Sequence, residues 1–180
     1  MRILIAIPFA ALALSPLHAL AADAISLPTS TAATLPVAEG DSSFDWTGFY
    51  AGVYGVAQSS PVGGVQYGVG LALGGNVAFD FFLVGGEVAV QGLTGGAGAT
   101  SYIEAVGRAG VLVSDNVAAY ATAGYGFDLG APVEDDLLAG AGLELAVSDN
   151  LSVRAQYLHG FPLTGANSKD QVTLGANFHF

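Results

Sequence analysis

Residues 171–180 read QVTLGANFHF, and this closing stretch decides how the chain folds. Its apolar residues occupy the even positions from Val172 to Phe180, while small or polar residues occupy the odd positions between them. A period of two is that of a β-strand with one apolar and one polar face. The sequence therefore predicts a final strand in which Phe180 itself belongs to the folded structure.

Composition and charge exclude several classes of protein. Hydrophobic residues make up 52% of the 180 residues, so the chain is not intrinsically disordered, although it contains 26 glycines. The absence of cysteine excludes disulfides and thiolate metal sites. Fifteen acidic residues against 4 basic ones give a net charge of −11. Such a surface cannot neutralise phosphates, so no nucleic-acid partner is expected.

The N-terminal stretch MRILIAIPFAALALSPLHALAADA indicates a secretory signal peptide over residues 1–21, cleaved after Ala21 or Ala22. A transmembrane anchor is the alternative, but the apolar stretch is short and is interrupted by Pro8 and Pro16. Residues 22–45 are rich in Ser, Thr, Ala and Pro, which predicts a flexible periplasmic linker. A short segment packed on the surface is the alternative for these residues.

The sequence contains a repeated turn. LVSDNVAAYATAGYGF (112–127) aligns without a gap with AVSDNLSVRAQYLHGF (146–161), and one further step back at the same spacing reaches Asp80. Asp and Asn accept tight-turn geometry and bond their own backbone. We therefore expect three short hairpin turns.

The segments between these turns predict eight strands. They cover residues 46–58, 65–79, 82–94, 100–113, 117–127, 137–147, 151–161 and 170–180. Three short turns then lie at one end and four longer loops at the other. Each strand has about ten residues, the length of a tilted strand that crosses a bilayer. The pattern predicts an all-β fold, an eight-stranded antiparallel up-and-down transmembrane β-barrel over residues 46–180.

The two faces of each strand differ in a way that orients them. Large aliphatic residues such as Leu71 and Leu143 share one face, while Gly, Ala and the charged residues share the other. Small and charged residues suit a narrow interior, and continuous aliphatics suit lipid. The sequence predicts that the aliphatic face points outward.

Charged residues on the inner face predict ion pairs in the lumen. A turn at 148–150 pairs Val147 with Leu151, which puts Glu144 opposite Arg154 and predicts that the two side chains contact each other. Across the loop at 95–99, one register puts Glu87 opposite Arg108 and Gln91 opposite Glu104; coincidence is the alternative reading. Paired charges are tolerable in a narrow barrel, whereas an unpaired one is costly. The predicted set is Glu144, Arg154, Glu87, Arg108 and Glu104.

Aromatic residues fall near the two ends of the predicted strands. The expected membrane-interface aromatics are Trp46, Phe79, Phe82 and Phe178 near the short turns, and Tyr125, Phe127, Tyr157 and Phe161 near the longer loops. Two aromatic girdles around an aliphatic band mark the two interfaces of a membrane barrel. The core of a soluble sandwich would instead spread its aromatics through the middle of the strands.

Residues 45–56, DWTGFYAGVYGV, resemble the opening strand of small outer-membrane β-barrel proteins of alphaproteobacteria, the outer membrane immunogenic proteins or porin-family surface antigens of the OmpA-like group. Trp46-Thr47-Gly48-Phe49-Tyr50 with Gly52 carries the resemblance. It implies a Gram-negative outer-membrane location and lipids and lipopolysaccharide as partners. It also implies insertion by the barrel assembly machinery, with Phe180 as part of the assembly signal.

Three motifs have a chemical interpretation and a plainer one. GVGLALG (68–74) fits a dinucleotide-binding pattern, but no helix follows, so we interpret it as small lumen residues or sites of close backbone approach. Glu134, Asp135 and Asp136 with Asp128 fit a divalent-cation loop, but their spacing matches no metal site, which favours a solvated loop. His159 has the place that a lipid-A-modifying enzyme would need, but no serine and carboxylate are evident to complete a relay.

The sequence thus predicts a barrel with a structural or surface role, without catalytic residues, cofactor or metal. A narrow porin-like channel and a lipid-A-modifying enzyme remain the alternatives. Eight strands leave an interior about wide enough for side chains alone.

Overall fold

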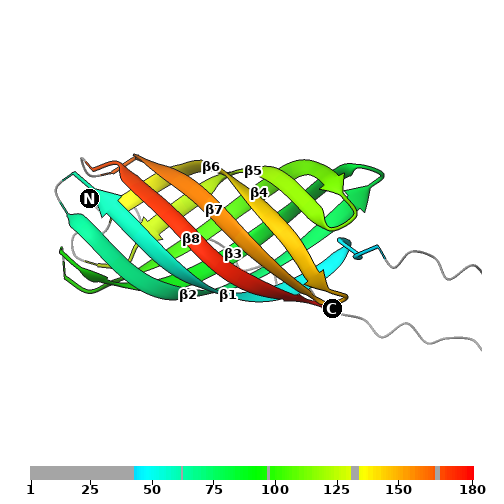
Figure 1. Ribbon diagram of the computed structural model, residues 1–180. Helices are drawn as coiled ribbons and strands as arrows, with labels where there is room; N and C mark the ends of the chain where they lie inside the picture. Colours follow the sequence, from blue (N-terminus) through cyan, green and yellow to red (C-terminus); the bar gives the residue numbers. More distant parts are fainter. Residues whose placement is uncertain (1–42, 62, 97, 131–133, 165–166) are drawn as a thin grey trace, which may run out of the picture. The chain divides into compact units, whose positions relative to one another are not determined.

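A computed structural model describes residues 43–180 except 62, 97, 131–133 and 165–166. The predicted signal peptide and all but the last three residues of the predicted linker lie outside the described residues. Among the described residues, no helix is long and apolar enough to cross a membrane. The described residues form eight strands in sequence order (Figure 1), with these bounds: β1 Gly48–Ser60, β2 Gly64–Phe79, β3 Phe82–Gly95, β4 Thr100–Ser114, β5 Val117–Asp128, β6 Glu134–Ser148, β7 Leu151–Pro162 and β8 Lys169–His179.

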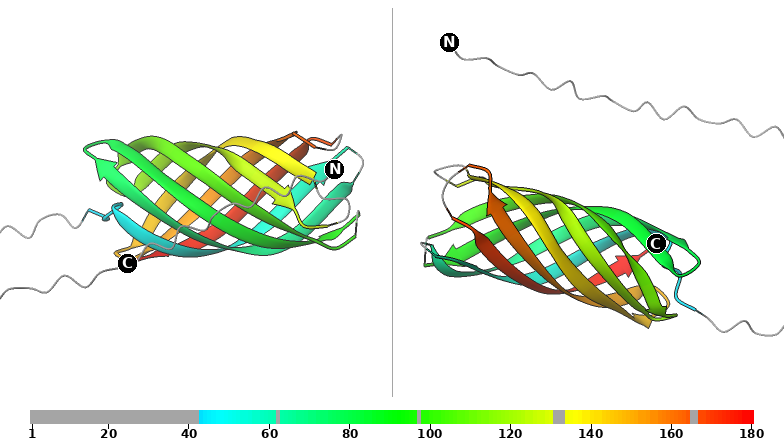
Figure 2. Two further views of the ribbon diagram at one scale, coloured as in Figure 1. Left: turned by 180° about the vertical axis from the view of Figure 1, so that it is seen from behind. Right: turned by 90° about the horizontal axis from the view of Figure 1, so that it is seen from above.

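The strands form one closed antiparallel barrel. Each strand pairs with the next in sequence, and β1 pairs with β8 to close the ring (Figure 2). Tyr50 pairs with His179 across this seam, and the backbone N–H of Phe180 donates to the carbonyl of Phe49 at 3.0 Å. Closure leaves no strand edge with unpaired backbone groups. The predicted fold class is confirmed, and the last residue is part of the closing seam.

The repeated Ser-Asp-Asn sequences form matching turns. Ser114 pairs with Val117 and Ser148 pairs with Leu151, and in each hairpin the register shifts at the preceding valine, Val113 or Val147. The extra residue is a β-bulge, which increases the local twist beside the turn. At the third turn, Asp80 adopts a φ of 56°, a conformation that Asp tolerates better than most residues.

The large aliphatic side chains point out of the barrel. Leu71 on β2 is 59% exposed and Leu174 on β8 is 65% exposed, whereas Gln91 and Glu144 on the opposite faces of their strands are 1% exposed. This confirms the predicted orientation, which is the reverse of that in a water-soluble barrel. An apolar surface that surrounds the whole barrel is suited to hydrocarbon.

Inward-facing tyrosines and glycines fill the lumen together. A methyl group added to Gly74 or Gly70 on β2 would lie 2.3 Å from the ring of Tyr50 or Tyr54 on β1. The same relation joins Gly142 to Tyr120, at 2.5 Å. A tyrosine can therefore lie flat across the narrow interior only where the facing residue lacks a side chain. GVGLALG contributes inner glycines to this packing, as the plainer reading of that motif expected.

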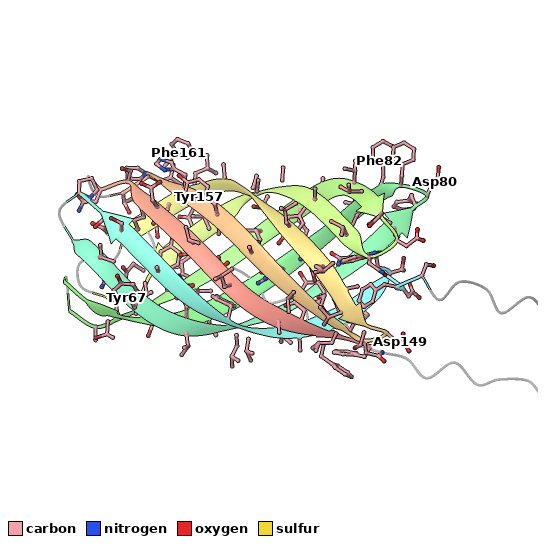
Figure 3. The ribbon with its side chains drawn as sticks, in the orientation of Figure 1. Tyr67, Asp80, Phe82, Asp149, Tyr157 and Phe161 are labelled. Carbon is pink, nitrogen blue, oxygen red and sulfur yellow. The ribbon has the colours of Figure 1, made fainter. Side chains whose placement is uncertain are left out.

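The predicted membrane-interface aromatics lie near the two ends of the barrel, with one exception. Figure 3 shows Tyr157 and Phe161 at the end with the longer loops and Phe82 at the end with the short turns. Phe79, Phe82, Phe178, Tyr125, Tyr157 and Phe161 are exposed on the outer surface. Phe127 is half-buried beside the Tyr125 ring. The placement of Trp46 at the lipid interface was wrong, because its side chain is 2% exposed and lies inside the barrel mouth.

The outward orientation predicts a depth-dependent response to charge. Leu71 lies near the middle of β2 and Val65 near its end, and both side chains point outward. In lipid vesicles, Leu71→Arg should destabilise the barrel by about 2–4 kcal/mol and Val65→Arg by about 0–1 kcal/mol. Denaturant unfolding of the two variants in the same vesicles measures the difference. Equal, small effects at the two positions would contradict the membrane-spanning orientation.

Candidate functional site

Two arginines and two glutamates cross the lumen between four strands. Glu87 on β3, Arg108 on β4, Glu144 on β6 and Arg154 on β7 are all buried. Arg154 donates to both carboxylate oxygens of Glu87, with Nη2 2.9 Å from Oε1. Arg108 donates from Nη2 to Oε2 of Glu144 at 2.6 Å, and its Nη1 lies 3.6 Å from Glu87. These four side chains, the central charge network, link opposite walls of the barrel.

Tyrosines hold this network in place. The Tyr50 hydroxyl donates to Glu87 Oε2 at 2.6 Å and accepts from Arg108 Nη1 at 2.7 Å. The Arg108 guanidinium also lies 4.0 Å from the centroid of the Tyr120 ring, a distance suited to a cation–π interaction. Each charge is thus matched by an opposite charge or a hydrogen-bond partner, as burial requires.

The predicted partners of Glu144 and Arg154 were wrong, although the predicted strand register was right. Glu144 and Arg154 are direct neighbours across β6 and β7. Both side chains point into the lumen, but no ion pair joins them among the described residues. Each reaches across the lumen instead, Arg154 to Glu87 and Glu144 to Arg108. A long arginine side chain in a narrow barrel can reach the far wall as easily as its strand neighbour.

The predicted register between β3 and β4 was also wrong. Glu87 pairs with Val106 rather than Arg108, and Glu104 pairs with Ala89 rather than Gln91. The error amounts to two residues, which leaves every side chain on its predicted face because the side-chain period is two. The inward orientation of Glu87, Arg108 and Glu104 was therefore right, and Glu87 and Arg108 do form an ion pair at 3.6 Å although they are not direct strand neighbours.

Glu104 is not part of an ion pair among the described residues, contrary to the prediction. Its Oε1 accepts from Gln171 Nε2 at 2.7 Å, and Gln171 Oε1 accepts in turn from Gln91 Nε2 at 2.7 Å. These three buried side chains from β3, β4 and β8 form a second layer across the lumen. Amide groups thus take the place of the expected cation.

At the short-turn end, Glu144 also binds a serine and a histidine. Its Oε1 accepts from Ser152 Oγ at 2.5 Å and from Asn177 Nδ2 at 2.7 Å, and lies 3.3 Å from His179 Nε2. Ser152 Oγ is 3.0 Å from the same Nε2. In a catalytic triad the acid holds Nδ1 while Nε2 takes the serine proton. Here acid and serine share one nitrogen, so the group fastens strand ends and is not arranged as a relay.

Phe44 and Trp46 close the short-turn mouth from inside. They pack with Leu83 and Ala118, and the Trp46 indole N–H donates to the carbonyl of Asp115 at 3.0 Å. The sequence contains a signal for this placement. The inward residues of β1, such as Tyr50, have even numbers, and Phe44 and Trp46 continue the same alternation before the strand begins. Sequence analysis overlooked it by assigning Phe44 to the linker and Trp46 to the membrane interface.

At the long-loop mouth, a lysine lies among the acidic residues that suggested a cation loop. Lys169 Nζ is 2.9 Å from Asp136 Oδ2, 3.2 Å from Glu134 Oε2 and 4.0 Å from Asp128 Oδ2. Tyr102 donates to the same oxygen of Asp136 at 2.7 Å. An ammonium group therefore occupies the place that a divalent cation would take, and no metal-binding cluster occurs in the part of the chain described.

His159 has a carboxylate partner that sequence analysis did not find. Its Nδ1 lies 2.8 Å from Oδ1 of Asp170, its neighbour across β7 and β8. The Tyr157 hydroxyl donates to the same oxygen at 2.5 Å. These three residues, the outer polar cluster, lie on the outward face at the long-loop end. The pairing was missed because the β7–β8 register had not been derived.

No protein family matches the sequence. No curated protein matches it either. Among solved structures, Ail, the attachment invasion locus protein of Yersinia pestis, is 16% identical, with 74% of this chain and 97% of Ail covered and a TM-score of 0.57. Ail in complex with the heparin analogue sucrose octasulfate gives the same identity and TM-score over 73% of this chain and 97% of that one. Neisserial surface protein A is 14% identical over 74% and 98% of the two chains, with a TM-score of 0.49.

At such identities the likeness to Ail shows the fold alone. Ail is an outer membrane protein. The fold of this chain and its apolar exterior are those of the eight-stranded β-barrels of the cell outer membrane.

The ion-pair partners in the central charge network differ from those predicted from the register, and this difference can be measured. Double-mutant cycles for unfolding should give a coupling of about 1–3 kcal/mol between Glu87 and Arg154, because the two groups are hydrogen-bonded and desolvated. The cycle for Glu144 and Arg154, which are strand neighbours without an ion pair, serves as the matched control and should give a smaller coupling. A larger coupling energy for Glu144 and Arg154 than for Glu87 and Arg154 would show that the partners predicted from the strand register are the right ones.

Proposed function

We propose that this chain is an integral outer-membrane barrel with a structural or surface role, and that it neither catalyses a reaction nor conducts solutes. The observation that supports this most directly is the central charge network, which links β3, β4, β6 and β7 across the lumen. Motif 45–56 further supports membership in the small OmpA-like surface antigens of alphaproteobacteria. We extend the same proposal to insertion by the barrel assembly machinery, with Phe180 exposed at the seam as part of its signal.

The narrow channel is the second candidate, and the lumen argues against it at three levels. Phe44 and Trp46 fill the short-turn mouth, and the central charge network lies above them. The layer of Gln91, Gln171 and Glu104 follows toward the long loops. Eight strands leave room for little beyond such side chains. Solute passage would require several of these contacts to break at once.

The enzyme is the third candidate, and neither His159 nor His179 has, among the described residues, the arrangement of neighbours that acyl transfer needs. His159 contacts Asp170 and the Phe161 ring, but the described residues offer no serine within hydrogen-bonding distance of it. His179 has a serine, but that group is buried at the opposite end beneath Phe44. A nucleophile, a base and an orienting acid must converge for this chemistry.

Membrane lipids and lipopolysaccharide are the partners that we propose for the outer surface. A sulfated glycan, the class of ligand present in the second Ail structure, is not favoured. The mouth at the long-loop end holds Asp128, Glu134 and Asp136 around Lys169, so a sulfated glycan would meet net negative charge there, whereas lipid acyl chains meet the apolar outer wall.

The closed lumen predicts electrical silence. In planar bilayers, wild-type protein that is shown to be folded by its heat-dependent gel mobility should give no ohmic conductance steps. A variant that combines Trp46→Ala, Glu87→Ala, Arg154→Ala and Gln91→Ala, and that is shown to be folded in the same way, should produce brief steps, because each of the three levels then loses a side chain. Leu71→Ala, which shortens an outward side chain, is the control and should remain silent. Steady ohmic steps from the wild type would instead support the channel.

Lipid A chemistry tests the enzyme. Cells that produce the wild-type barrel and cells that produce His159→Asn should contain lipid A with the same acyl composition by mass spectrometry, because no serine of the described part of the chain bonds His159. Loss of an acyl chain that depends on the wild-type histidine would establish catalysis and overturn the structural assignment.

A further inference from the structure

We propose that the outer face of β4–β8 binds one membrane lipid with a primary ammonium headgroup, its acyl chain lying in a surface groove and its ammonium bound by Asp170. The inference rests on the proposed membrane location of the barrel. It does not depend on whether the lumen conducts, so the lipid site and the proposed lack of conductance can be disproved independently.

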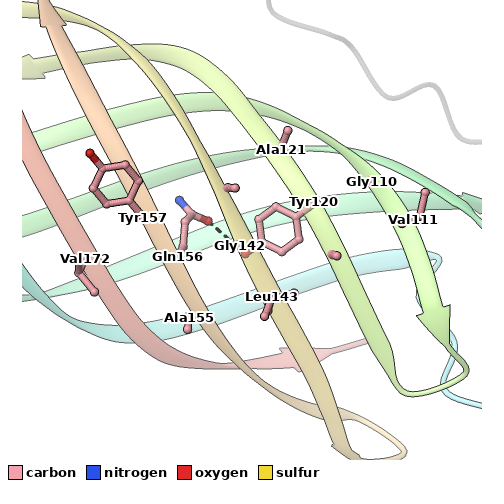
Figure 4. Close-up of a pocket in the computed structure, with 12 residues that line it drawn as sticks. Gly110, Val111, Tyr120, Ala121, Gly142, Leu143, Ala155, Gln156, Tyr157 and Val172 are labelled. Atoms are coloured by element: carbon pink, nitrogen blue, oxygen red, sulfur yellow. Dashed lines mark hydrogen bonds between the residues drawn. The ribbon is translucent and has the colours of Figure 1, made fainter.

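The groove is a shallow apolar depression of about 600 Å³ on the outer wall. Its floor consists of outward methyl groups on neighbouring strands, Ala119, Ala121, Ala141 and Ala155. The larger side chains of Val111, Leu143 and Tyr157 form its walls. Figure 4 shows these residues spread from Val111 on β4 to Tyr157 on β7 and Val172 on β8. Its volume is within the roughly 300–1,000 Å³ typical of small-molecule sites.

The outer polar cluster stands at one end of this groove. The Tyr157 ring lines the groove, and its hydroxyl bonds Asp170. Asp170 and Val172 share the outward parity of β8, so a carboxylate and the groove wall follow each other along one strand. An apolar groove that ends at a charged group near the rim of the barrel matches a lipid molecule, in which an apolar acyl chain ends at a polar headgroup.

The bonding of Asp170 points to the chemistry of the headgroup. Tyr157 and His159 both bind Oδ1, and Oδ2 makes no hydrogen bond to the described residues. The Asp170 side chain is half exposed on the outward face. A carboxylate so placed is complemented by a cationic donor, and a primary ammonium supplies both positive charge and N–H groups. A quaternary ammonium has no N–H to donate, and an anionic headgroup would be repelled.

Two other grooves on the outer wall have no such end. One of about 740 Å³ runs over β1, β2, β3 and β8, and one of about 550 Å³ lies around Ala51, Leu71 and Val88. Neither is lined by a residue that bonds Asp170, as Tyr157 does in the groove over β4–β8. They can seat acyl chains without a carboxylate held at one end, which makes them internal controls.

Native mass spectrometry tests the site. The folded protein is equilibrated in detergent with equal amounts of phosphatidylethanolamine, phosphatidylcholine and phosphatidylglycerol of identical acyl chains. We expect one retained phosphatidylethanolamine, preferred roughly tenfold over the other two, as the loss of one charge-assisted hydrogen bond implies. Asp170→Asn should abolish this preference while a lipid is still retained.

Ala141→Leu should remove the retained lipid of any headgroup, because the added atoms fill the groove. Ala51→Leu makes the same change in the groove without a charged end and should leave the adduct unchanged. Heat-dependent gel mobility confirms that each variant is folded. The proposal is overturned if Ala141→Leu retains the lipid as the wild type does, or if the wild type holds the three lipids equally. Dimers that disappear with Ala141→Leu would assign the groove to a second copy of the chain and also overturn it.

Discussion

The structure depends on the requirement that backbone N–H and C=O groups find partners within the protein wherever water is absent. For strands this means a sheet with no free edge, and the bond between Phe180 N–H and Phe49 C=O completes the last seam. The closed sheet has an outer and an inner surface, and the two require different side chains. The outer one faces hydrocarbon and is aliphatic, and the inner one must be filled by whatever eight strands can enclose.

The narrow interior explains the unusual composition. Tyrosines can cross it only over glycines, as Tyr50 does over Gly74. Charged groups can enter it only when they are matched, as Arg154 is by Glu87. The inward glycines and the pairing of the lumen charges are thus two results of one geometric limit. The matched groups also lock the walls together, which suits a barrel whose lumen is filled rather than open.

The features predictable from sequence were those with a short period or a short range. Alternation located the strands and their outward faces, and the repeated Ser-Asp-Asn turn located hairpins together with the β6–β7 register that places Glu144 beside Arg154. Across a longer loop the register between Glu87 and Arg108 was wrong by two residues, because loop length does not fix pairing. The Arg108–Glu144 and Arg154–Glu87 pairs could not be predicted, since a flexible arginine side chain can reach any wall of a closed barrel. Register also decides which side chains meet at Asp170, so the outer polar cluster was not found either.

The inner and outer surfaces of the barrel differ in how well they tolerate substitutions. A lumen residue such as Arg108 contacts Glu87, Glu144, Tyr50 and Tyr120, so replacing it disturbs several strands at once. An outward residue such as Ala141 meets only its neighbours on the wall and the surrounding membrane. Recognition can therefore be altered on the outside without loss of the fold. The side chains in the lumen are engaged in contacts that stabilise the barrel. Interactions with a lipid or another partner can therefore arise on the outer wall and at the long-loop rim. The groove that we propose to end at Asp170 connects these two regions.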